Sequence, residues 1–138
     1  MGTRSFIILK TDNQYKGIYC HWDGYPEHNG QILLNHYCSK AVIDQLVSKG
    51  DLSALATSVE ACSYYIDRGD DPTSVKPYKH DKIENVIEIA EKSGCEYIYL
   101  FEKDEWFIAE RGAQFFGLSD GSEFSDFTHL KEKELREF

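Results

Sequence analysis

The stretch that decides the fold is Tyr97-Ile98-Tyr99-Leu100-Phe101-Glu102-Lys103-Asp104-Glu105-Trp106-Phe107-Ile108-Ala109. Its first five residues have no polar face, which is typical of a strand that is covered on both sides. Lys103 and Asp104 separate this run from a second β-prone run over 105–109, so the segment predicts a β-hairpin. We therefore expect a strand over 97–101 at the centre of a sheet.

A second hairpin is expected over residues 4–10 and 16–22, because two β-prone runs flank the polar segment 11–14. Three helices are expected beside the strands. One starts at Pro26, which suits a first helical position, and runs to residue 37. Gly30 inside it indicates that a packed strand or a ligand approaches the backbone closely. The others follow the N-cap candidate Ser39, over 40–49, and cover 80–93, where the apolar periodicity is clearest.

The remaining segments are less regular. We expect a short turn of helix over 51–57, a strand near 62–66, a long irregular segment over 67–77 and a surface helix over 127–137. No repeat or linker interrupts the 138 residues. The sequence thus predicts a single α+β domain spanning 1–138, with a small mixed or antiparallel β-sheet built from two hairpins and about three packed helices.

Composition restricts the function classes. The net charge is −9, which argues against direct nucleic-acid binding, because that affinity depends on Lys and Arg. The charge fits simple solubility, a basic partner or mimicry of nucleic-acid charge. The four cysteines are far apart with no metal-type spacing, and the apolar run over 6–9 is too short for a signal peptide or a membrane span. We expect reduced thiols, a cytoplasmic location and no membrane contact.

One dense cluster could carry binding chemistry: Tyr19-Cys20-His21-Trp22-Asp23-Gly24-Tyr25-Pro26-Glu27-His28-Asn29-Gly30. It leaves a predicted strand through a turn and enters a helix N-terminus, where backbone N–H groups favour anions or polar ligands. The aromatic rings could stack on a base and the polar side chains could hydrogen-bond to it. The structural alternative is that the aromatic rings plug the junction between hairpin and helix. The candidate binding residues are His21, Trp22, Asp23, Tyr25, His28 and Asn29, together with Arg4 and Arg68.

The same cluster resembles a family of small uncharacterised bacteriophage and prophage proteins. The resemblance is close over residues 17–37 and loose over most of the chain, and it includes Thr3-Arg4-Ser5 and Asp67-Arg68-Gly69-Asp70. It implies a phage accessory protein in the bacterial cytoplasm, a context in which proteins often counter host defences. The resemblance transfers no activity to any residue.

Three functional hypotheses follow. The leading one is a non-catalytic binding protein that recognises a small nucleotide-like ligand or a host protein through the 21–30 turn. The second is an acidic protein that mimics nucleic-acid charge and inhibits a host nucleic-acid-binding protein, with a continuous carboxylate face that uses Glu84, Glu88, Glu91 and the C-terminal acids. The third is a small hydrolase that uses His21 or His28, although no catalytic or metal motif supports it. We expect no cofactor and no metal, and homo-oligomerisation is left open.

Overall fold

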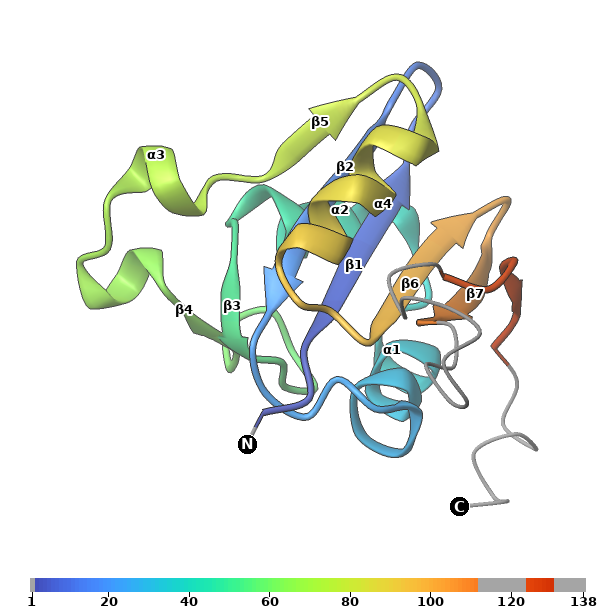
Figure 1. Ribbon diagram of the computed structural model, residues 1–138. Helices are drawn as coiled ribbons and strands as arrows, with labels where there is room; N and C mark the ends of the chain where they lie inside the picture. Colours follow the sequence, from blue (N-terminus) through green and yellow to red (C-terminus); the bar gives the residue numbers. More distant parts are fainter. Residues whose placement is uncertain (1, 112–123, 131–138) are drawn as a thin grey trace.

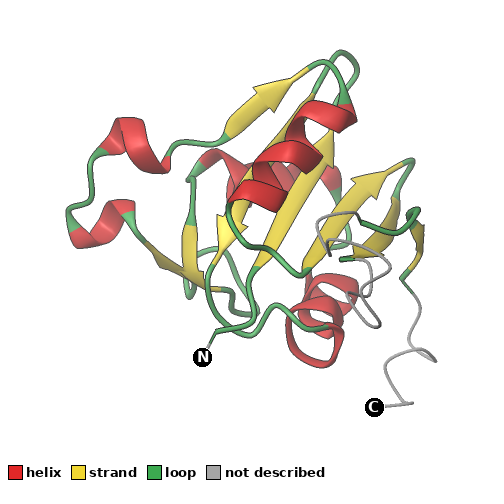
Figure 2. Cartoon of the chain, in the orientation of Figure 1, coloured by secondary structure: helices red, strands yellow, loops and turns green. Residues whose placement is uncertain are grey.

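The computed structural model describes residues 2–111 and 124–130, and within these ranges the chain forms a mixed eight-stranded sheet with helices on both faces (Figures 1 and 2). The α+β class predicted from the sequence is confirmed. The strands are β1 (Ser5–Lys10), β2 (Tyr15–Cys20), β3 (Leu52–Ala54), β4 (Ser63–Tyr64), β5 (Tyr78–His80), β6 (Tyr97–Glu102), β7 (Glu105–Glu110) and β8 (Thr128–His129). The helices are η1 (Pro26–Gly30, a π-helical turn), α1 (Gln31–His36), α2 (Lys40–Ser48), η2 (Ile66–Arg68, a 3₁₀ turn), α3 (Pro72–Val75) and α4 (Ile83–Lys92).

Both predicted hairpins are present, and they join through their first strands. The sheet order is β4-β3-β2-β1-β6-β7-β8, and β5 pairs with β2 outside this path. Within each hairpin the strands are antiparallel, whereas β1 and β6 are parallel, with Ile7 opposite Tyr99. The β6–β7 turn places Lys103 and Asp104 at φ 54° and 63°. This geometry matches a two-residue hairpin turn whose twist suits the strands.

The two central strands are buried on both faces, as predicted for residues 97–101. Alternate residues of β1 enter different cores, because successive side chains of a strand point to opposite sides. Ile7 and Leu9 pack with α1 and α2, while Phe6 and Ile8 pack beneath α4. A continuous apolar run is therefore what these positions require.

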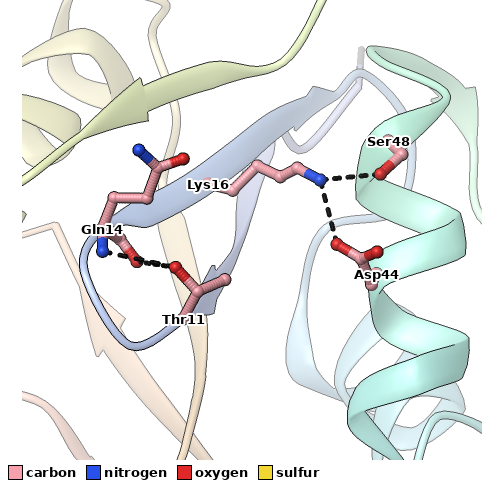
Figure 3. A network of polar contacts seen from close by, with 5 residues as sticks. All are labelled: Thr11, Gln14, Lys16, Asp44 and Ser48. Carbon is pink, nitrogen blue, oxygen red and sulfur yellow. Dashed lines mark hydrogen bonds and ion pairs between the residues drawn. The ribbon is translucent and has the colours of Figure 1, made fainter.

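A half-buried lysine of the first hairpin bonds to helix α2. Lys16 Nζ lies 2.9 Å from Asp44 Oδ1 and 2.7 Å from Ser48 Oγ (Figure 3). Nearby, the Thr11 hydroxyl donates to the Gln14 carbonyl and closes the hairpin loop. The helix begins as predicted, because Ser39 Oγ accepts the backbone N–H of Val42.

The predicted helix over 26–37 consists of η1 followed directly by α1. Gly30 lies at their junction, where a Cβ would come 3.4 Å from the ring and hydroxyl of Tyr99. Of the two explanations that the sequence left open for this glycine, the structure shows the packed strand.

The prediction of a helical turn over 51–57 is wrong. Leu52–Ala54 form the strand β3, which lies parallel to β2. The backbone N–H groups of His21 and Trp22 donate to the carbonyls of Leu52 and Ser53, at 3.0 Å in both cases. The spacing of Leu52 and Leu55 suggested a helix. The segment is extended instead, because its carbonyl groups pair with backbone N–H groups that follow β2 and would otherwise have no partner.

The other boundaries also differ in part. The helix predicted over 80–93 begins at Ile83, because residues 78–80 pair with β2 as β5. The segment 67–77 contains the helix α3, for which Asp71 is an N-cap, and the strand predicted near 62–66 is limited to β4. Thr128 and His129 are in a strand, so the helix predicted over 127–137 is wrong there, and residues 131–137 lie outside the described residues.

Candidate functional site

The turn after β2 is held tightly against the start of β1. The backbone N–H of Gly24 donates to the Thr3 carbonyl at 2.7 Å, and the buried Tyr99 hydroxyl donates to the Gly24 carbonyl at 2.7 Å. A Cβ at Gly24 would come 2.7 Å from both the Ser5 side chain and the Thr3 carbonyl. Only glycine permits this approach without displacement of the backbone. Asp23, directly before it, has a φ of 56°.

Asn29 fastens the turn from inside. Its side chain is completely buried, and Nδ2 lies 3.4 Å from each of three acceptors: Ser5 Oγ, Cys20 Sγ and the Trp22 carbonyl. Its Oδ1 lies 2.9 Å from His28 Nδ1. These bonds satisfy a buried amide and join β1, β2 and η1. Asn29, predicted as a binding residue, is thus inaccessible to a ligand in this conformation and positions the turn.

The exposed side of the turn carries three rings in sequence order along one face. Tyr19 Oη and His21 Nδ1 lie 2.7 Å apart, and the His21 ring meets the Trp22 ring edge-on at 4.7 Å between centroids. Trp22 is 43% exposed and, among the described residues, is the one large hydrophobic side chain that is exposed. An exposed indole whose orientation is held by a neighbouring ring is typical of positions on which a base or another aromatic ring stacks.

Arg4 lies beside this row. A Cβ at Gly94 would come 2.8 Å from an Arg4 guanidinium nitrogen, which places the arginine side chain at the end of α4. Burial raises the pKa of Tyr19 to about 12, and the positive charge of Arg4 partly opposes this rise. The Tyr19 hydroxyl therefore stays protonated at neutral pH and can donate a hydrogen bond.

The segment 65–68 approaches the same row. Tyr65 contributes to raising the pKa of Tyr19, so the two phenols are within electrostatic range of each other. The Arg68 guanidinium lies over the Tyr65 ring, 5.4 Å from its centroid. Arg68 is exposed. Arg4 and Tyr65 are therefore within electrostatic range of Tyr19, and Arg68 adjoins Tyr65.

The other predicted residues form a second group on the helix side. Tyr25 Oη donates to Asp23 Oδ1 at 3.3 Å, and the Tyr25 and His28 rings are 6.2 Å apart. His28 also lines a hollow of about 230 Å³ along η1 and α1, together with Glu27, Gln31, Ile32, Asn35 and His36. In the part of the chain that the structure describes, no direct ring contact connects this group to Trp22.

The candidate binding residues chosen from the sequence did not include Tyr19, Tyr65 or Asp51. Tyr19 could have been found from the strand period, because residues 19 and 21 point to the same side of an extended segment. Tyr65 and Asp51 have no local signal, since they reach β2 only through tertiary structure. The Asp51 carboxylate accepts the backbone N–H of Tyr19 at 2.9 Å, and the Asp51 backbone carbonyl accepts that of Tyr65 at 3.2 Å.

Asp51 is expected to make the stability of the fold depend on pH. Asp51 is only 8% exposed, and burial raises the pKa of its carboxyl to about 6. The hydrogen bond that the carboxylate accepts from the backbone N–H of Tyr19 partly opposes this rise. The unfolded carboxyl has a pKa of about 3.9, so the native state binds the proton more tightly. The stability that this tighter proton binding contributes is fully present below about pH 4 and is lost as the pH rises through about 6.

Asp51→Asn is therefore expected to raise the free energy of unfolding by about 1–2 kcal/mol at pH 8, because the acceptor for Tyr19 is retained and the buried charge is removed. The gain should shrink as the pH falls from 7 to 4.5. Urea titrations of both proteins across this range measure the difference. A difference that does not change with pH would contradict the assignment.

The described residues also bear on the hydrolase hypothesis, the acidic-mimic hypothesis and membrane contact. No group of three or more His, Cys, Asp or Glu side chains suited to a metal ion occurs among the described residues. His21 and His28 have different partners, Tyr19 and Asn29. On α4 the acidic face is interrupted, because Lys92 pairs with Glu88 at 3.3 Å. No helix in residues 2–111 and 124–130 has both the length and the apolar character needed to cross a bilayer.

Comparisons of the chain with protein-family models, with curated proteins and with solved structures found no match. The site is therefore interpreted from its own residues.

Proposed function

We propose that this is a cytoplasmic binding protein that recognises a small nucleotide-like ligand, meaning an aromatic ring that carries an anionic group. The observation that carries the proposal is the exposed Trp22 indole at the end of the Tyr19–His21–Trp22 row. A base can stack on that indole, since every base has a π-face. His21 and the Tyr19 hydroxyl offer hydrogen bonds beside it.

The anionic group would meet arginine. Arg4 lies beside Tyr19, and Arg68 lies on Tyr65, which is near Tyr19. Guanidinium groups suit phosphate because they offer two parallel donors. In the phage context that the sequence resemblance implies, such a protein would bind and withhold a nucleotide signal of the bacterial host.

Among the described residues, the α4 part of the carboxylate face that the acidic-mimic hypothesis needs is interrupted by Lys92, which pairs with Glu88. A host protein remains the other class of partner for the same surface. The nucleotide proposal differs from it in predicting saturable binding of a small molecule to the purified protein.

The test uses the tryptophan itself. Trp22 is 43% exposed, whereas Trp106 is 4% exposed, so acrylamide should quench mainly Trp22. Nucleoside mono-, di- and triphosphates and cyclic dinucleotides are added one by one, and a bound ligand should protect Trp22 from the quencher. Isothermal titration calorimetry then gives the affinity.

Trp22→Ala and Arg68→Ala are each expected to weaken binding at least about tenfold, through lost stacking and a lost charge-assisted bond. Neither should lower the melting temperature by more than a few degrees, because both side chains are exposed. Lys79→Ala, which removes an exposed cation from β5, is the matched control and should bind normally. Absence of binding by every nucleotide class, or unfolding of Trp22→Ala, would refute the proposal.

A further inference from the structure

Residues 65–75 form an arm that projects from the sheet on the side of β3 and β4 (Figure 1). The arm contains η2, the left-handed Gly69 with a φ of 90°, and α3. Every residue from 67 to 74 is exposed, and Val75 is buried where the chain returns to the sheet. The stretch 67–74 therefore adds no buried apolar contact that would hold the arm in place.

The arm is bonded mainly to itself. The Tyr65 carbonyl accepts the backbone N–H groups of Arg68 and Asp70, at 3.0 and 3.3 Å. Among the described residues, the one hydrogen bond or ion pair that joins 66–74 to the rest of the protein is between Lys49 and Asp67, at 3.4 Å, and both partners are exposed. Exposed ion pairs contribute little to stability. The arm therefore has its own shape but is weakly attached along its length.

Both ends of the arm are bonded to one residue, Asp51. Its backbone N–H donates to the Val75 carbonyl at 2.8 Å, and its carbonyl accepts the backbone N–H of Tyr65 at 3.2 Å. The Asp51 carboxylate accepts the backbone N–H of Tyr19, in β2, at 2.9 Å. Gly50 permits the close approach of the Val75 end, because a Cβ there would overlap the Val75 carbonyl oxygen. Asp51 thus joins both ends of the arm to β2.

The Asp51 carboxylate has no ion-pair partner among the described residues. Burial, followed by the charge of Asp51, raises the pKa of Tyr78, in β5. Burial also raises the pKa of Cys95 to about 12; Asp51 adds a smaller part, and Arg4 and Arg111 oppose the rise. The phenol and the thiol are therefore uncharged at neutral pH, and neither compensates the carboxylate. A buried carboxylate without a cation is stabilised when water reaches it.

We infer that the arm opens from the sheet as one unit, and that ionisation of Asp51 favours the open state. Opening breaks the bonds of Asp51 to Tyr65 and Val75 and lets water reach the carboxylate. The inference concerns the fold alone and holds whether or not a nucleotide binds. Because the arm carries Arg68, binding at the proposed nucleotide site would weaken as the open state becomes more populated.

The expected size of the effect follows from the two environments of Asp51. In the closed state burial raises the pKa of its carboxyl to about 6, whereas an exposed aspartic acid has a pKa of about 3.9. Between pH 5 and 7.5 the closed state loses its proton, while the open state is already ionised. The population of the open state should therefore rise about tenfold over this range.

Amide hydrogen exchange followed by NMR measures the opening. Where exchange reports the opening equilibrium, the ratio of intrinsic to observed rate shows how rarely each amide opens. The amides of Asp51 and Tyr65 lose their bonds on opening, so they should be at least about tenfold less protected than that of Leu100 in the central strand β6. Their protection should fall about tenfold between pH 5 and 7.5. Equal protection at the three amides, or no change with pH at Asp51 and Tyr65, would overturn the inference.

Variants assign the pH dependence to one group. Asp51→Asn keeps an acceptor for Tyr19 but cannot ionise, so the protection of the Tyr65 amide should no longer change with pH. Asp67→Asn is the matched control, because it removes an exposed carboxylate from the arm itself and should keep the tenfold change. His21→Gln is a second control, because the titratable His21 imidazole lies 2.7 Å from the Tyr19 hydroxyl. A pH dependence that persists in Asp51→Asn, or is lost in His21→Gln, would contradict the role of Asp51.

Discussion

Replacing Trp106 with alanine is expected to lower the free energy of unfolding by about 3–5 kcal/mol, a loss typical of truncating a large buried aromatic side chain. The indole is 4% exposed and packs edge-on against Phe101, at 5.1 Å between ring centroids. Its Nε1–H donates to the Tyr37 carbonyl at 2.8 Å, and Tyr37 is the residue that ends α1. The change therefore leaves a cavity and also an unpaired carbonyl.

Trp106→Phe separates these two causes. Phenylalanine keeps most of the ring contact but cannot donate to Tyr37, so a loss of about 1–2 kcal/mol is expected from the hydrogen bond and the small residual cavity. Urea unfolding followed by far-ultraviolet circular dichroism measures both variants without relying on tryptophan emission. If the phenylalanine variant were as unstable as the alanine variant, the hydrogen bond and not the packing would dominate at this position.

Asn29→Asp is expected to destabilise the protein by about 3 kcal/mol or more at neutral pH, although the two side chains have the same shape. Aspartate cannot donate to Ser5 Oγ, Cys20 Sγ or the Trp22 carbonyl, which Asn29 Nδ2 meets at 3.4 Å each. It also places a charge in a completely buried position. An unpaired buried charge costs several kcal/mol.

The loss at residue 29 should shrink as the pH falls, because protonation removes the charge and restores one donor. Thermal unfolding at several pH values between 4.5 and 8 measures this recovery. Asn35→Asp, on the exposed face of α1, is the matched control and should change stability by less than about 0.5 kcal/mol. A small effect of Asn29→Asp at neutral pH would mean that the turn opens readily and that Asn29 does not fasten it.

The fold could be predicted where local pattern and tertiary environment agree. The apolar run at 97–101 indicated a strand covered on both faces, and β6 occupies that position between β1 and β7. Ser39 indicated the start of α2, and its hydroxyl caps the helix. In each case the residues that form the element also carry its signal.

The prediction failed where a segment takes its structure from a distant partner. Leu52–Ala54 and Tyr78–His80 are strands because two parts of the same edge of β2 require backbone partners. Three-residue strands of this kind have no periodicity of their own. The candidate site shows the same division. The sequence singled out His21 and Trp22, but only the structure shows that Asn29 is buried against Ser5 and Cys20.

By itself the sequence determined the two hairpins, the helices that follow Pro26 and Ser39, and the concentration of aromatic and polar side chains at 19–30. These depend on residue type and spacing over a few positions. It is the tertiary packing that sets β1 parallel to β6 and brings Tyr65 within electrostatic range of Tyr19. Such contacts join residues far apart in the chain, and the packing of the whole sheet selects them.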